Sequence, residues 1–134
     1  LIYAIGPWNP IVECYDPAKN EWNFVADYFL NRAYRSLTVT SHQDKIYLLL
    51  GDGFQVFDPE FNTWTFLPEP FDLIYRKSGK LVSINDKLLH IRSQQPKNIS
   101  EFNTNNNLWL TLLDFEDKYC YDDHLGEPVV VNFS

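Results

Sequence analysis

The fold is decided by the run Phe57-Asp58-Pro59-Glu60-Phe61-Asn62-Thr63-Trp64, which repeats an earlier run, Tyr15-Asp16-Pro17-Ala18-Lys19-Asn20-Glu21-Trp22. A degenerate third copy runs from Phe102 to Trp109. The three tryptophans that end these runs are 42 and 45 residues apart. A period of this length indicates a repeat architecture, in which one supersecondary unit recurs and is stabilised by stacking on its copies.

Each copy sits among short apolar runs that are typical of β-strands. One run precedes it, as in Lys45–Gly51, and another follows it, as in Thr65–Leu67. Still earlier in the second and third units lie Leu37–Thr40 and Leu81–Ile84. These runs are rich in β-branched and aromatic residues and are bounded by turn-forming residues. The sequence therefore predicts four short strands in each unit and no helix.

The repeated run itself predicts a turn followed by a residue that packs between neighbouring sheets. Asp58-Pro59 and the following Asn62 are turn formers, because proline presets φ and Asn or Asp side chains cap the backbone. The third copy has Asn103-Thr104-Asn105 instead, still a turn but without the proline. Trp64 and its equivalents are large, rigid side chains, so we expect them to pack between neighbouring sheets.

Taken together, these residues resemble the kelch repeat, in which an Ile-Tyr strand and a glycine pair precede Tyr-Asp-Pro, a polar turn and Trp. The resemblance implies an all-β fold, a fragment of a kelch-type β-propeller with about three four-stranded blades. The units would span residues 1–36, 37–80 and 81–126, with a final strand of the next blade at 127–134. The chain departs from the glycine pair, having Gly6-Pro7, Gly51-Asp52 and Arg92-Ser93 in its place.

Length and composition limit the class of protein. The 134 residues fit one domain, and 45% hydrophobic residues exclude an intrinsically disordered chain. A net charge of −7 argues against a nucleic-acid partner. No apolar run is long enough to cross a membrane, so no membrane partner is expected. Two cysteines far apart in sequence indicate a reducing compartment, and we expect a cytoplasmic protein.

The resemblance also predicts what completes the ring. Three blades are half of a propeller of about six blades. The chain opens at the second strand of a blade, so the missing first strand is expected from the remaining propeller blades or from a second copy of the chain. A partner protein or peptide would then bind to one rim, where the connections between second and third strands and between consecutive blades gather.

The resemblance places candidate partner-binding residues in those connections. Tyr, Trp and Arg are enriched at protein–protein hot spots, which singles out several of them. The candidates are Trp8, Asn9, Arg32, Tyr34, Arg35, Tyr75, Arg76 and Arg92. Tyr28 and Phe71 also have the pattern of exposed residues. Two alternatives stay open, namely that the Trp8 loop packs on itself and that Arg35 and Arg76 brace neighbouring blades.

The function implied by the resemblance is non-catalytic protein recognition. The chain would be the substrate-binding kelch domain of a cullin-RING ubiquitin ligase adaptor, with cullin bound through a BTB region that these residues do not contain. The alternatives are an actin-associated kelch scaffold and a copper radical oxidase. No cofactor, metal or catalytic site is expected, because none of His42, His90 and His124 pairs with a cysteine or a carboxylate at the spacing of metal ligands. Cys14-Tyr15 and Cys120-Tyr121 are sequence neighbours, whose side chains would point to opposite faces of a strand. This argues against the cross-linked Cys and Tyr that the copper radical oxidase alternative requires.

Overall fold

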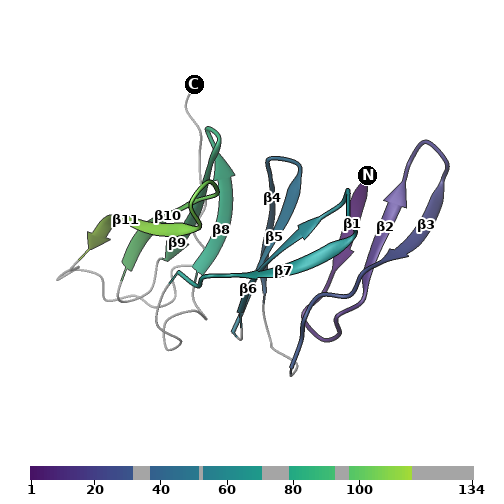
Figure 1. Ribbon diagram of the computed structural model, residues 1–134, viewed down its shortest axis with the longest axis horizontal. Coiled ribbons are helices and arrows are strands. Elements are labelled where there is room, and N and C mark those ends of the chain that lie inside the picture. Colours follow the sequence, from purple (N-terminus) through teal and green to yellow (C-terminus); the bar gives the residue numbers. More distant parts are fainter. Residues whose placement is uncertain (32–36, 52, 71–78, 93–96, 116–134) are drawn as a thin grey trace.

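A computed structural model describes residues 1–31, 37–51, 53–70, 79–92 and 97–115, which form three antiparallel sheets (Figure 1). Within these residues the chain contains strands and no helix, so the predicted all-β class is confirmed. The strands are β1 (Ile2–Ile5), β2 (Val12–Asp16), β3 (Glu21–Val25), β4 (Thr38–His42), β5 (Lys45–Leu50), β6 (Gly53–Asp58), β7 (Thr63–Leu67), β8 (Gly79–Ile84), β9 (Lys87–Arg92), β10 (Lys97–Asn103) and β11 (Leu108–Phe115).

Each sheet is a meander in which consecutive strands pair. The second sheet has the order β4-β5-β6-β7, and the third has β8-β9-β10-β11. The first sheet has three described strands, β1-β2-β3, and β1 occupies the position that β5 and β9 hold in the others. The expected unit boundary at 80/81 falls inside β8, which begins at Gly79. The boundary at 126 and the expected strand at 127–134 lie outside the described residues.

The repeated run forms the same turn in all three sheets. The Asp58 carboxylate accepts a hydrogen bond of 3.0 Å from the backbone N–H of Glu60, and Asp16 does the same for Ala18. In the third sheet the amide oxygen of Asn103 accepts the equivalent bond from Asn105. Because asparagine supplies the same acceptor as aspartate, the turn forms without the proline.

The ends of the sheets differ. One end carries two-residue turns, at Gln43-Asp44 and Asn85-Asp86, in which both residues have positive φ. This geometry matches the twist of a β-hairpin, and it agrees with the turn-forming residues that bound the strand runs in the sequence. The other end, at the bottom of Figure 1, carries the longer connection between β1 and β2.

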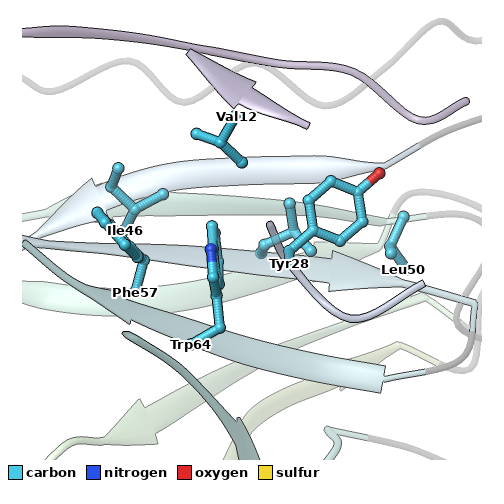
Figure 2. Packing of buried hydrophobic residues seen from close by; sticks show 7 residues of the cluster. Val12, Tyr28, Ile46, Leu50, Phe57 and Trp64 are labelled. Atoms are coloured by element: carbon cyan, nitrogen blue, oxygen red, sulfur yellow. The ribbon is translucent and has the colours of Figure 1, made fainter. Parts of the chain in front are cut away.

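A layer of packed apolar side chains joins the first sheet to the second (Figure 2). Val12 and Tyr28 from one side meet Ile46, Phe57 and Trp64 from the other. The Trp64 indole N–H donates a 2.8 Å hydrogen bond to the carbonyl of Ala26, the first residue after β3. The tryptophan is therefore held by packing and by a hydrogen bond across the seam, as the sequence predicts.

The seam between the second and third sheets repeats this arrangement. Tyr47, Leu49 and Phe54 pack against Leu88 and Phe102. The Trp109 indole N–H donates to the carbonyl of Pro68, the first residue after β7, at 2.8 Å. This bond is the counterpart of the Trp64 bond, because in both seams the tryptophan donates to the first residue after the last strand of the preceding sheet.

Polar side chains also cross the second seam. The Thr38 hydroxyl accepts a 2.9 Å hydrogen bond from the backbone N–H of Leu81. His42 Nδ1 lies 2.7 Å from the Ser83 hydroxyl oxygen. These bonds tie β4 to β8, and the three sheets stack side by side in the manner of propeller blades.

Candidate partner-binding rim

The loop of residues 6–11, which joins β1 to β2, is fixed at both ends by Tyr28. The Tyr28 hydroxyl donates a 2.7 Å hydrogen bond to the carbonyl of Gly6. The Tyr28 backbone N–H donates to the carbonyl of Pro10 at 3.1 Å. Tyr28 itself is buried in the first seam. The expectation that Tyr28 is exposed was therefore wrong, because its ring fills the core and its polar groups satisfy the loop.

Trp8 projects from this anchored loop into solvent, with 65% of its surface exposed. Pro7 and Pro10 flank it and restrict the backbone. The Asn9 side-chain oxygen accepts a 3.1 Å hydrogen bond from the Ile11 N–H, so Asn9 shapes the loop. The Trp8 indole is exposed although Tyr28 and the Asn9 side chain hold the backbone of the loop. The loop therefore presents a large aromatic side chain from a fixed backbone.

The connection that follows β3 is fixed to the second sheet by Gln55. The Gln55 side-chain oxygen accepts from the Phe29 N–H at 2.9 Å, and its amide nitrogen donates to the Phe29 carbonyl at 2.8 Å. The Phe29 ring stacks on Phe66 with ring centroids 4.8 Å apart. The sequence analysis did not predict this pair of hydrogen bonds between Gln55 and Phe29. The feature that marks it is a glutamine at a fully buried strand position.

Five of the predicted partner-binding residues lie outside the described residues: Arg32, Tyr34, Arg35, Tyr75 and Arg76. Arg92 is another of the predicted partner-binding residues. It is the last residue of β9 and is only 6% exposed. It lies opposite Gly79 and Asn98 in the strand register. Asn98 lies in β10.

His90 is a buried histidine on the face of the third sheet that meets the second. Burial, together with the smaller effect of the nearby positive charge of Arg92, lowers its pKa from 6.5 to about 4. The imidazole is therefore neutral at physiological pH. His90 occupies the register position that Leu48 holds in the second sheet. His90 is therefore a core residue of the third sheet.

The described residues contain no group of three His, Cys, Asp or Glu side chains that could hold a metal ion. Cys14 and Tyr15 are consecutive in β2, so their side chains leave opposite faces. Cys14 instead pairs with Tyr3 across β1 and β2. Burial raises the pKa of the Tyr3 hydroxyl, and the neighbouring Cys14 thiol raises it further. No helix among these residues is long and apolar enough to span a membrane.

Comparison with known proteins gives one weak relationship. No family model matches the chain. The chain is 35% identical over 75 residues to a kelch repeat and BTB domain-containing protein 8 from Xenopus tropicalis. The match covers 49% of this chain and 12% of that relative. The chain thus spans a small part of the relative's length, and it resembles a kelch repeat protein over about half of its own.

Proposed function

We propose that the chain is a non-catalytic protein-recognition module whose rim binds an extended peptide or loop of a partner protein. The observation that carries this proposal is Trp8, exposed on a loop that Tyr28 fixes at both ends. Tryptophan is a frequent hot-spot residue. A loop that is already ordered loses little conformational entropy on binding, so more of the contact energy appears as affinity.

A more specific proposal concerns what happens to the partner protein after it binds to the rim. We propose that the partner is a substrate delivered to a cullin-RING ubiquitin ligase in the cytoplasm, with cullin bound through a BTB region elsewhere in a longer protein. The likeness to a kelch repeat and BTB domain-containing protein supports this role. The net charge of −7 would accelerate association with a basic segment.

The recognition role is tested with peptides selected for binding to the purified chain. Trp8→Ala is expected to weaken binding at least about tenfold, or about 1.4 kcal/mol. Phe61→Ala is the matched control, because Phe61 is about as exposed as Trp8. It lies in the β6–β7 turn of the second sheet, at the opposite end of the strands from the Trp8 loop. Calorimetric titration measures both. Equal affinity of the wild type and the Trp8 variant would overturn the proposal.

The ligase role needs a cellular test. Proximity labelling by the full-length protein is expected to recover a cullin together with a substrate whose recovery depends on Trp8. Recovery of actin without cullin would favour the scaffold alternative and reject the ligase proposal. The peptide titration is independent of this result, so the two proposals fail separately.

A further inference from the structure

Phe29 and Phe66 form a stacked aromatic pair at one end of the seam between the first and second sheets. Their ring centroids are 4.8 Å apart and their ring planes are inclined by 22°. Phe29 is 50% exposed and Phe66 is 53% exposed, so the pair presents apolar surface to solvent. The two sheets beside the pair are both described and are already packed against each other. A further sheet therefore cannot enter between them and cover the pair.

The backbone that carries Phe29 is held on the second sheet at two points. The Ala26 N–H donates a 2.8 Å hydrogen bond to the Asn62 side-chain oxygen, and the Ala26 carbonyl accepts from Trp64. Three residues later the Gln55 side chain binds both the N–H and the carbonyl of Phe29. Gln55 is only 1% exposed, so water competes little for these bonds. The position of the Phe29 ring is therefore set within the chain itself.

Gly53 makes room for the other ring of the pair. A Cβ atom at Gly53 would lie 2.9 Å and 3.2 Å from two ring carbons of Phe66. The Phe66 ring thus lies directly against the backbone of Gly53, in space that a side chain would fill. Phe66 is positioned by this glycine in the way that Phe29 is positioned by Gln55.

The seam between the second and third sheets shows that stacking of the sheets does not require this pair. The residues of the third sheet that are equivalent to Gln55 and Phe66 are Ser100 and Thr111. The third sheet nevertheless packs against the second, and Trp109 makes its hydrogen bond across that seam. The aromatic pair is therefore an addition to the repeat and not a part of what joins the sheets.

Tyr28 places the pair beside the loop that carries Trp8. Its hydroxyl and its backbone N–H hold the two ends of that loop, and Phe29 is the next residue in the chain. Phe66 is the last but one residue of β7, which runs away from the β6–β7 turn. The pair and the Trp8 loop are therefore at the same end of the sheets and depend on the same support.

We propose that Phe29 and Phe66 are a second contact point for the partner that binds Trp8, and that they bind an apolar side chain of an extended partner segment. This inference rests on the proposed function. Gln55 occupies both polar groups of the Phe29 backbone, so at Phe29 the chain offers a ring and no free hydrogen-bonding group. Apolar and aromatic side chains are the groups that pack on such rings.

Peptides selected from a random library for binding to the purified chain are the probe. Phe66→Ala is expected to weaken their binding at least about fivefold, as measured by calorimetric titration. Gly53→Ala should weaken binding as well, because the new Cβ displaces the Phe66 ring. Phe61→Ala is the control, since Phe61 is an exposed phenylalanine at the other end of the same sheet, and it should leave the affinity unchanged. Unchanged affinity of the Phe66→Ala chain would refute the second contact point.

A double-mutant cycle separates contact from a structural effect. One apolar residue of the peptide should matter for the wild type and for Trp8→Ala, but not for Phe66→Ala. Loss of affinity at Phe66→Ala without such a residue would mean that Phe66 acts on the fold, and would reject the inference. Phe66→Leu, which keeps an apolar side chain, replaces Phe66→Ala should the latter lose its strand signal in circular dichroism.

The two proposals for the rim fail separately in these titrations. Weakening by Trp8→Ala alone would reject the second contact point and leave the proposed function in place. Weakening by Phe66→Ala alone would reject the role of Trp8 and support the stacked pair as the contact.

Discussion

Trp22 and Trp64 hold the same position in consecutive sheets, after the same Asx turn and in the same register, yet one is exposed and the other buried. The difference lies outside their own strands. Trp64 has another sheet packed against it and a carbonyl in reach of its indole, whereas Trp22 has neither within the described chain. Local sequence therefore sets where the indole points, and the adjacent sheet sets how much the indole contributes to stability.

The largest effect is expected from truncating the two tryptophans. Trp64→Ala removes a buried ring and a seam hydrogen bond, and it should lower the free energy of unfolding by about 4 kcal/mol. Trp22→Ala removes a ring that is mostly in water, and it should cost less than about 1 kcal/mol. Urea denaturation followed by far-ultraviolet circular dichroism measures both.

Trp64→Phe sharpens this first prediction. It keeps most of the apolar contact and removes the bond to the Ala26 carbonyl, so we expect an intermediate loss. Equal costs for Trp22→Ala and Trp64→Ala would contradict the assignment of Trp64 to a seam.

His90 in the third sheet and Leu48 in the second sheet hold equivalent positions, but only His90 can bind a proton. The pKa of His90 is lowered to about 4 in the folded chain, so between pH 6.5 and about pH 4 the unfolded chain binds a proton that the folded chain does not. The stability due to neutral His90 is complete above pH 6.5 and is lost as the pH falls, up to about 3 kcal/mol. His90→Leu should remove this loss.

Denaturation at pH 6.5 and near pH 4 checks this effect. Carboxylates titrate in the same range in both proteins, so the difference between wild type and variant isolates His90. Should the two proteins lose stability equally, the buried imidazole would not be the group responsible.

The strands and turns were predictable because they depend on neighbours in sequence. Asp58, Asn62 and Trp64 recur with a fixed spacing, and the structure builds the same turn each time. The seam role of Trp64 was predictable as well, since a four-stranded unit must stack to bury both faces. This reasoning requires only the repeat.

The rim was predicted less well because its geometry depends on contacts far apart in sequence. Tyr28 is buried through a bond to Gly6, and Phe29 is held by Gln55, and no periodicity reports either pairing. A tyrosine in a connection has the same local pattern whether it faces solvent or fills a seam. Trp8 was chosen as a partner-binding candidate from its residue type, but the anchoring of its loop by Tyr28 was not predicted.

The smallest effect distinguishes the asparagines that precede the seam tryptophans by two residues. Asn20, Asn62 and Asn107 all have φ between 53° and 57°, which glycine also adopts readily. Each Asn→Gly substitution therefore keeps the turn and removes only the side chain. The comparison then reports what each side chain binds.

Asn62→Gly should cost about 1 kcal/mol more than Asn107→Gly, because only Asn62 accepts a bond from the adjacent sheet. The counterpart of Ala26 in that seam is Pro68, which has no N–H to donate, so the bond from Trp109 to its carbonyl is not accompanied by a bond to Asn107. Asn20→Gly should fall near Asn107→Gly, since its bond to the Tyr15 hydroxyl is exposed and stays within one sheet. Denaturation midpoints rank the three variants, and an equal cost at Asn62 and Asn107 would mean that the bond to Ala26 adds nothing to the seam.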